Sequence, residues 1–200
     1  MRIILDAMGG DNAPQAPVIG ALQAAKDFGA QIILVGRGEE ILSVMRAQGY
    51  NDLPEGIEIA HADEVVDMHD DPATVVRKRK NSSMMIGLKM LADGMGDAFV
   101  SAGSTGALLT GATLLVKRVK GIRRAAMGPA MPNKAGGKTV ILDCGANAEC
   151  TPEFLLQFGL VGSLYAKKCM GVDNPKIGLL NIGTEDSKGT PLQKEAYALL

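Results

Sequence analysis

Short apolar runs alternate along the chain with longer segments that have the spacing of amphipathic or buried helices. Six of these short runs are rich in Ile, Leu and Val, which is typical of buried strands. They lie at residues 2–5, 31–35, 57–60, 97–100, 138–142 and 176–180. The helices between them carry recognisable ends. Gly29 stops one after Phe28, and Thr151-Pro152 begins another whose Phe154 and Phe158 share a face. This alternation predicts an α/β fold with a parallel sheet covered on both faces.

Polar, glycine-bearing segments follow four of the predicted strands. They are Asp6 with the turn after it, Ser101–Gly106, Asp143–Asn147 and Asn181–Lys188. Because parallel crossovers are right-handed, the carboxyl ends of the strands gather along one edge of the sheet. Ligands of open α/β sheets bind at that edge. We therefore expect these four segments to form one site.

The segment 99–115 is the most informative of the four. Gly103 and Gly106 let the backbone turn and let a ligand approach closely. Ser104 or Thr105 caps the following helix, whose free N–H groups predict an anion site. The alternative interpretation is that this pair only caps an ordinary helix. Residues 106–116 are apolar or small on every side, which predicts a helix buried all round.

Composition narrows the class of protein. The chain has 200 residues, 46% of them hydrophobic, and a net charge of −1. This predicts a single α/β domain over residues 1–200 and argues against a nucleic-acid binder, which usually carries a basic excess. The sequence shows no secretory signal and no apolar run of about 20 residues. Three cysteines without a CxxC pair favour a reduced, cytoplasmic protein. Residues 191–200 begin a helix without an end signal, so we expect the N-terminal part of a longer protein.

Three other patterns have plain interpretations. His61, His69 and nearby carboxylates lack the spacing of metal ligands, so no metal site is predicted. The turn at Gly36-Arg37-Gly38 is an incomplete dinucleotide fingerprint and is interpreted as an ordinary turn. The basic run Arg77–Lys80 is either a solvated face or a docking patch for an acidic partner or a phosphate group.

Five motifs together carry a family resemblance. They are Leu5–Pro14 (LDAMGGDNAP), Val76–Ser83 (VRKRKNSS), Ser101–Ala107 (SAGSTGA), Leu142–Asn147 (LDCGAN) and Asn181–Gly189 (NIGTEDSKG). In this order they resemble the bacterial phosphate acyltransferases that make acyl phosphates for phospholipid synthesis. Ser104 stands where many relatives carry Asn, and serine keeps the capacity to donate and accept hydrogen bonds. Relatives continue past Leu200 and include an apolar helical hairpin that is thought to touch the membrane.

The resemblance implies a three-layer α/β/α sandwich with a mostly parallel sheet, like that of isocitrate and isopropylmalate dehydrogenases and phosphate acetyltransferases. It implies a cytoplasmic homodimer that contacts the membrane only through a region absent from these 200 residues. The implied partners are acyl-[acyl-carrier protein] and inorganic phosphate, which react to give acyl phosphate and free carrier protein. No metal or organic cofactor is expected.

The implied chemistry suits the residues. Phosphate is already an anion at neutral pH, so the protein must mainly hold it, aim it and stabilise the oxyanion formed on the thioester. We expect Gly103, Ser104, Thr105 and Gly106 to cradle phosphate. Lys188 would neutralise phosphate or the oxyanion, and Asn147 would donate a hydrogen bond to one of them. Asp6 and Asp143 would orient Lys188 or the backbone amides.

The acidic carrier protein is expected to dock on basic side chains of two segments: Arg77, Lys78 and Arg79, with Lys80 beside them, or Arg123 and Arg124. Two alternatives stay open. Cys144 would accept the acyl group covalently, although the carboxylate of Asp143 beside it disfavours the thiolate. In the other, the protein binds phosphate or carrier protein without turnover.

Overall fold

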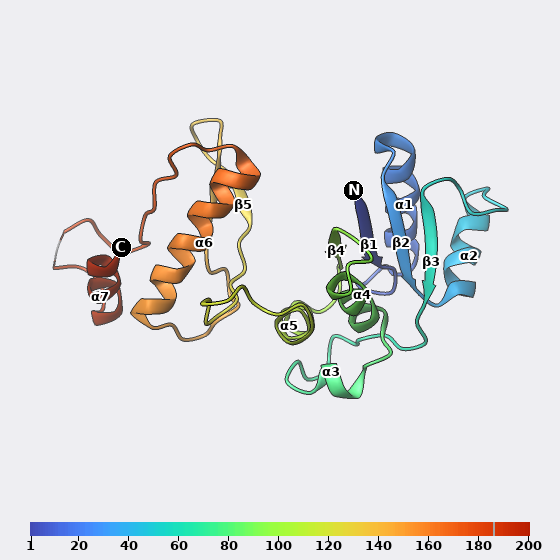
Figure 1. Cartoon of the computed structure of the whole chain (residues 1–200), viewed down its shortest axis with the longest axis horizontal. Helices are drawn as coiled ribbons and strands as arrows, with labels where there is room; N and C mark the ends of the chain where they lie inside the picture. Colours follow the sequence, from blue (N-terminus) through green and yellow to red (C-terminus); the bar gives the residue numbers. More distant parts are fainter. Residues whose placement is uncertain (186) are drawn as a thin grey trace. The chain divides into compact units, whose positions relative to one another are not determined.

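The computed structural model describes residues 1–185 and 187–200, which divide into two compact units, Met1–Lys117 and Arg118–Leu200 (Figure 1). Asp186, a member of the last motif, lies outside the described residues. The expectation of a single domain over residues 1–200 stays a prediction.

The first unit is built on a four-stranded sheet in the order β3-β2-β1-β4, and every neighbouring pair is parallel. Its strands are β1 (Arg2–Asp6), β2 (Gln31–Gly36), β3 (Ile57–His61) and β4 (Ala98–Val100). Its helices are α1 (Gln15–Phe28), α2 (Gly38–Ala47), α3 (Val75–Lys78), α4 (Ser83–Ala92), α5 (Thr105–Gly111) and the π-helix η1 (Ala112–Val116). The first four predicted strands and the end of α1 at Gly29 are thus confirmed.

Successive residues of β2 point to opposite faces of the sheet, and both faces are covered. Ile32 and Leu34 pack in one buried cluster with residues of α1 and α2. Ile33 and Val35 pack in another, against residues of α4. In Figure 1, α2 lies beside β3, and α4 lies beside β1 and β4. The three-layer α/β/α arrangement expected from the alternating sequence is therefore confirmed, since a strand buried on both faces needs a helix layer on each.

A third buried cluster joins α3, α4 and α5 and includes Val75, Met85 and Ala107. Ser82 caps α4 by accepting a hydrogen bond from the backbone N–H of Met85 at 3.4 Å. This cluster fixes the segment between β3 and α4 beside the beginning of α5, at the carboxyl edge of the sheet.

The second unit contains an antiparallel pair of strands and two helices. The strands are β5 (Ala130–Pro132) and β6 (Lys138–Val140), and the helices are α6 (Pro152–Met170) and α7 (Pro191–Leu199). Helix α6 begins as predicted, with the side chain of Thr151 accepting from the N–H of Phe154, and ends at Gly171. Its Phe158 is buried, whereas Tyr165 on the same predicted face is exposed.

Three expectations about elements are wrong. The run 138–142 does not extend the parallel sheet, because Lys138–Val140 pairs antiparallel with Ala130–Pro132. Residues 176–180 form no strand among the described residues. A short apolar run indicates only a local preference for extended backbone. Whether it forms a strand depends on its pairing with another segment of the chain.

The helix expected to be buried all round is the third error. It changes from α5 to the π-helix η1 at Ala112, and Leu114 is 57% exposed. Only Ala107 and Gly111 of this pair of helices are buried. The first unit therefore covers one side of the helix, although its composition is apolar throughout.

Candidate functional site

Asp6 and Ser101 connect the ends of two adjacent strands. The Ser101 hydroxyl donates a hydrogen bond of 2.7 Å to Oδ2 of Asp6. Oδ1 of Asp6 accepts from the backbone N–H of Met8 at 3.1 Å, and Oγ of Ser101 accepts from that of Gly103 at 3.1 Å. Asp6 is only 1% exposed, so these contacts satisfy a buried carboxylate. The turns after β1 and β4 thus come together, as the sequence predicts.

Glycine makes this close approach possible. A Cβ placed on Gly9 would lie 2.5 Å from Oδ2 of Asp6 and 2.9 Å from Oγ of Ser101. Gly10 has a φ of 101°, in the region that favours glycine. The two turns therefore pack backbone against side chain with no room for a further carbon atom.

The four residues expected to cradle an anion lie directly after this contact. Ser104 is buried and caps α5, because its Oγ accepts from the N–H of Ala107 at 3.4 Å. The prediction that Ser104 or Thr105 caps the helix is thus confirmed for Ser104. Thr105 is exposed, and a Cβ on Gly106 would lie 2.8 Å from Cγ of Pro72. A role of this turn in binding phosphate stays a prediction.

A cavity of about 430 Å³ opens beside the two turns. Met8, Gly10 and Gly103 contribute the turns to its wall. The rest of the wall consists of Asp11, Arg37, Arg79 and residues 63–68. Arg37 donates from Nε to the carbonyl oxygen of Asp63 at 3.0 Å. The cavity thus lies within the first unit, and its wall combines the carboxylates of Asp11, Asp63, Glu64 and Asp67 with two guanidinium groups and a few apolar side chains.

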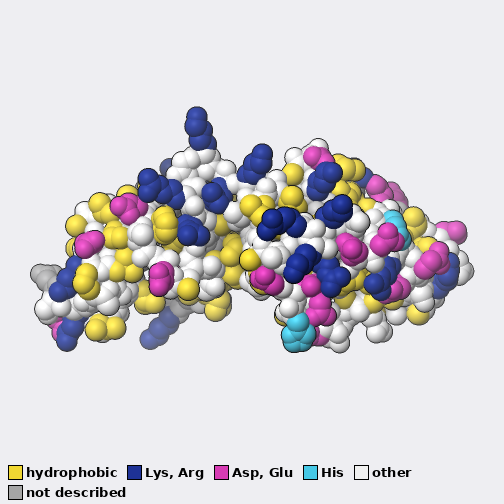
Figure 2. Space-filling view, turned by 90° about the horizontal axis from the view of Figure 1, so that it is seen from below, with side chains coloured by type: hydrophobic (Ala, Val, Ile, Leu, Met, Phe, Trp, Pro, Cys, Tyr) yellow, Lys and Arg dark blue, Asp and Glu magenta, His cyan; other side chains and the backbone are white. Residues whose placement is uncertain are grey.

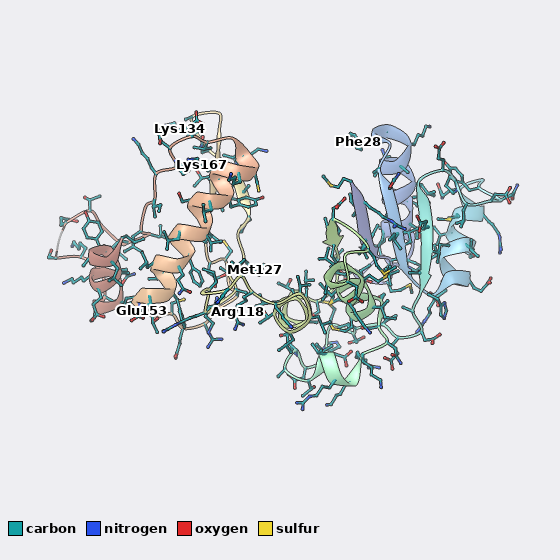
Figure 3. The ribbon with its side chains drawn as sticks, in the orientation of Figure 1. Phe28, Arg118, Met127, Lys134, Glu153 and Lys167 are labelled. Carbon is teal, nitrogen blue, oxygen red and sulfur yellow. The ribbon has the colours of Figure 1, made fainter. Side chains whose placement is uncertain are left out.

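Asp143 and Asn147 form a second polar cluster, in the second unit. Asp143 accepts backbone N–H groups from Met127 at 2.8 Å, Ala146 at 3.2 Å and Asn147 at 2.7 Å (Met127 is labelled in Figure 3). Burial raises the pKa of the Asp143 carboxyl, but these bonds and one from the Asn147 side chain outweigh it, so the pKa is lowered overall. Asp143 is therefore held as a carboxylate that fixes the loop 143–147.

The side-chain amide of Asn147 is engaged within the same cluster. Its Nδ2 donates to the carbonyl oxygen of Ala125 at 2.9 Å and to Oδ2 of Asp143 at 3.0 Å. Both amide hydrogens are therefore used inside the second unit. Donating to a substrate would require Asn147 to release one of them.

Lys188 lies on an exposed turn in the second unit. Its backbone N–H donates to the carbonyl oxygen of Glu185 at 2.9 Å. Among residues 1–185 and 187–200, its side chain makes no hydrogen bond or ion pair with another candidate site residue. The structure thus brings together Asp6 with the turn 101–106, and Asp143 with Asn147. One site made from both groups and Lys188 remains a prediction.

The basic residues expected to dock a partner differ in whether their side chains are free or engaged in contacts within the described structure. Arg77 and Lys78 are exposed, whereas the guanidinium group of Arg79 is paired with Asp70. Arg124 lies over the ring of Phe154, 5.6 Å from its centroid, and Arg123 is exposed. Figure 2 shows lysine and arginine side chains interspersed with acidic ones rather than a surface of one sign.

Cys144 and Cys150 lie in different surroundings. Cys144 is exposed, with its backbone N–H bonded to the carbonyl oxygen of Met127 at 3.0 Å. Burial is the main cause of a raised pKa of the Cys150 thiol, and the charge of Asp143 raises it further.

No group of three or more His, Cys, Asp or Glu side chains in the described part of the chain is arranged to hold a metal ion. No helix described in the structure has the length and apolarity to span a membrane.

Sequence reasoning missed Ser101 as the partner of Asp6 and Gly9 as the residue that admits their contact. The sequence does contain a signal for Ser101. Asp6 and Ser101 directly follow the predicted strands 2–5 and 97–100, and neighbouring parallel strands place such residues side by side. The need for glycine at position 9 had no local signal, since the atoms that exclude a Cβ belong to Asp6 and Ser101 after folding.

Comparison with known proteins gives the family. The family model described as "Fatty acid synthesis protein" matches residues 1–200. A phosphate acyltransferase of Bacillus thuringiensis (strain Al Hakam) is 44% identical over 201 residues, covering 100% of this chain and 59% of that protein. A phosphate acyltransferase of Acetivibrio thermocellus is 45% identical over 201 residues, covering 100% of this chain and 58% of the relative. The chain thus spans less than two thirds of the length of these relatives.

A solved structure supports the fold. The crystal structure of a phosphotransacetylase from Streptococcus pyogenes matches with a TM-score of 0.73 and 22% sequence identity, over 100% of this chain and 64% of that one. This similarity bears on the fold alone. The resemblance expected from the five motifs is confirmed by the family match and by relatives aligned along the whole chain. The chain therefore belongs to the fatty acid synthesis protein family, which its 200 residues match from end to end.

Proposed function

We propose that this protein transfers an acyl group from acyl-[acyl-carrier protein] to inorganic phosphate, giving acyl phosphate and free carrier protein for phospholipid synthesis. The observation that carries the proposal is the contact between the turns after β1 and β4, made by Asp6 and Ser101 at 2.7 Å. Two family motifs meet there, at the edge of a parallel sheet where ligands bind. The relatives named phosphate acyltransferase support the same reaction class.

The reaction requires little proton transfer at its start. An oxygen of hydrogen phosphate adds to the thioester carbonyl carbon, a C–O bond forms, and the carbonyl electron pair moves onto oxygen. Collapse of this oxyanion breaks the C–S bond and releases the thiolate of the carrier, which takes up the proton of the phosphate. The protein must therefore hold an anion and stabilise a second one, without a nucleophile of its own.

The residues divide this work between the two polar clusters. Thr105 and the backbone near Gly106 offer hydroxyl and N–H donors to phosphate. Gly103, whose own N–H donates to Ser101, shapes the turn beside Asp6. Ser104 supports them by capping α5. In the second unit, Lys188 neutralises phosphate or the oxyanion, and Asn147, ordered by Asp143, donates a hydrogen bond to one of them.

The carrier protein is acidic, so exposed cations suit its docking. Arg77 and Lys78 are exposed at the C-terminal end of α3, next in sequence to Arg79, which lines the cavity. Arg123 and Arg124 offer a second basic pair in the other unit. The family resemblance further supports a cytoplasmic homodimer, with a membrane contact made by a region outside these 200 residues.

The test is a product assay. Purified protein is incubated with acyl-[acyl-carrier protein], with and without inorganic phosphate, while free carrier protein and acyl phosphate are followed, and the full-length protein is run beside it. Formation of both products only when phosphate is present supports the proposal. Turnover by the full-length protein alone places an essential element outside residues 1–200. No product from either protein contradicts the proposal and favours a module that binds without turnover.

A further inference from the structure

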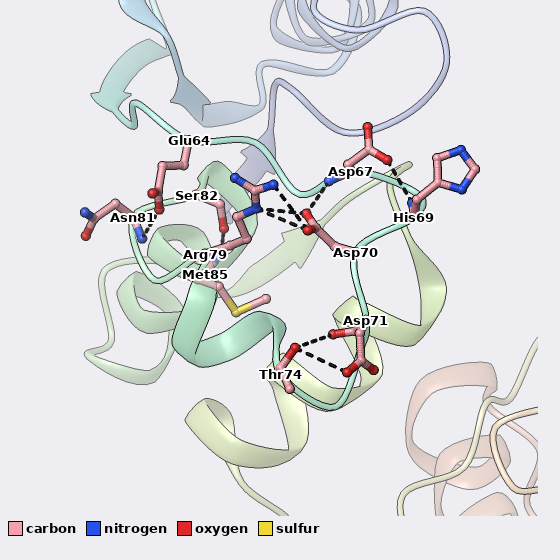
Figure 4. A network of polar contacts seen from close by, with 10 residues as sticks. All are labelled: Glu64, Asp67, His69, Asp70, Asp71, Thr74, Arg79, Asn81, Ser82 and Met85. Atoms are coloured by element: carbon pink, nitrogen blue, oxygen red, sulfur yellow. Dashed lines mark hydrogen bonds and ion pairs between the residues drawn. The ribbon is translucent and has the colours of Figure 1, made fainter.

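The segment 62–82, between β3 and α4, is closed at its base. The backbone N–H of Glu64 donates to the carbonyl oxygen of Asn81 at 3.4 Å, and that of Ser83 donates to the carbonyl oxygen of Glu64 at 3.1 Å. Oε2 of Glu64 also accepts from the N–H of Asn81 at 3.1 Å (Figure 4). The two ends of the segment therefore leave the rest of the unit side by side. We call residues 62–82 the crossover segment.

Arg79 and Asp70 close the crossover segment a second time, farther from its base. Nε of Arg79 donates to Oδ2 of Asp70 at 3.0 Å, and Nη2 donates to Oδ1 at 3.2 Å (Figure 4). Oδ2 of Asp70 also accepts from the backbone N–H of Asp67 at 2.9 Å. The hydrogen bond from Arg79 is the main cause of the lowered pKa of Asp70, and the same bond raises the pKa of Arg79. A planar guanidinium group suits such a two-point contact better than an ammonium group does.

The crossover segment held in this way lies against the candidate site. Pro72 stands close to Gly106, whose added Cβ would be 2.8 Å from Cγ of Pro72. Val66, Met68 and Arg79 line the same cavity as Gly10 and Gly103. The segment therefore forms the cavity wall together with the glycine turns, and the pair of Arg79 and Asp70 lies within it.

We propose that Arg79 is a positioning residue rather than a docking residue. Through Asp70 it holds the crossover segment as the wall beside the turns after β1 and β4, and so sets how tightly substrate binds there. The role in substrate binding rests on the proposed function. Arg77 provides the contrast, because it lies two residues away, is exposed and makes no ion pair among the described residues.

The proposal is tested by R79Q, D70N and the double variant R79Q/D70N in the full-length protein, with R77Q as the matched control. Hydrogen exchange of residues 64–72 is measured by mass spectrometry. If the pair holds the segment, each single variant speeds exchange by roughly three- to tenfold, and the double variant adds nothing further. R77Q leaves exchange unchanged, and R79K, which keeps the charge but not the fork, gives an intermediate rate.

Kinetics then separate positioning from docking. R79Q and D70N are each expected to raise KM for the acylated carrier protein by roughly three- to tenfold, with kcat within about twofold of the unmodified enzyme. A docking role predicts the opposite for D70N, because removing an acidic group would favour an acidic partner. It also predicts that R79Q weakens the salt dependence of KM, which positioning leaves unchanged.

Each result has a separate meaning. Exchange in R79Q that matches R77Q overturns the closure by Arg79 and Asp70. Faster exchange with an unchanged KM overturns the role in substrate binding and leaves the transferase proposal in place. Absence of turnover by the unmodified full-length protein contradicts the proposed function and with it this role, whatever the exchange rates are.

Discussion

The hydroxyl of Ser101 donates a 2.7 Å hydrogen bond to Oδ2 of Asp6, across 95 residues of sequence. Asp6 is the last residue of β1 and Ser101 directly follows β4, and these two parallel strands are neighbours in the sheet. The bond leaves Oδ1 of Asp6 to accept from the N–H of Met8 and Oγ of Ser101 to accept from that of Gly103. One carboxylate therefore sets the shape of both turns of the candidate site.

Replacing Ser101 with alanine removes the hydroxyl donor to a buried carboxylate. A buried acceptor that loses its partner costs about 1–3 kcal/mol, so the free energy of unfolding of S101A should fall by about that amount. Urea denaturation measures the change. S43A, at an exposed serine of α2, is the control and should stay within about 0.5 kcal/mol of the unmodified protein. Equal stability of the two variants would show that the bond does not hold the turns.

Gly9 is expected to be intolerant of even one methyl group. In G9A the new Cβ would lie 2.5 Å from Oδ2 of Asp6 and 2.9 Å from Oγ of Ser101, so the two turns must separate. Overpacking of this kind costs about 1–3 kcal/mol and should also weaken phosphate binding. G20A is the control, because a Cβ on Gly20 meets no atom within 4 Å and alanine favours helix α1 by up to about 1 kcal/mol. Thermal unfolding of both variants checks the contrast, and a G9A protein as stable as G20A would contradict it.

Sequence patterns predicted the first unit well because its strands carry their own signals. Residues of β2 are buried on both faces, and such strands are continuous apolar runs that stand out from their surroundings. The clustering of Asp6 with the turn 101–106 followed from the rule that parallel strand ends share an edge. Here local pattern and topology point to the same arrangement.

The second unit was predicted less well because a strand-like run does not show which segment it will pair with, or in which direction. Lys138–Val140 has the composition of a strand, but nothing in it states that Ala130–Pro132 will pair with it antiparallel. Residues 176–180 have a similar composition and form no strand.

In the first unit, the basic run Arg77–Lys80 gave no sign that Arg79 alone pairs with a carboxylate. Its partner, Asp70, lies nine residues earlier in the sequence, outside the run.

The carboxyl of Asp143 should titrate below its ordinary pKa of 3.8. Its hydrogen bonds require the ionised form, so the folded pKa is depressed and the carboxylate stabilises the folded chain at neutral pH. That contribution is lost as the pH falls below 3.8 through the lower folded value. Carboxyl-detected NMR titration measures the pKa, with D143N to assign the signal. A pKa at or above the ordinary value would show that the loop 143–147 is not held by these bonds.

Exposed Arg77 and Lys78 should contribute to binding an acidic carrier protein. Charge reversal in R77E or K78E is expected to weaken binding by roughly three- to tenfold at low ionic strength, and the difference should shrink as salt is added. Surface plasmon resonance at several salt concentrations measures this. K26E, at an exposed lysine of α1, controls for the change in net charge. If R77E, K78E and K26E bind alike, the docking surface lies elsewhere.

A substitution of Lys188 tests the proposed mechanism directly. Its side chain has no partner of opposite charge among the described residues that would give it a structural role. Neutralising phosphate or the oxyanion matters most in the transition state, so K188A in the full-length protein should lower kcat by about 10²–10³ without loss of stability. K188R keeps the charge and should retain part of the activity. K194A, at an exposed lysine of α7, is the control. Near-normal turnover by K188A, measured as phosphate-dependent release of carrier protein, would remove Lys188 from catalysis and leave the turns of the first unit to bind phosphate without it.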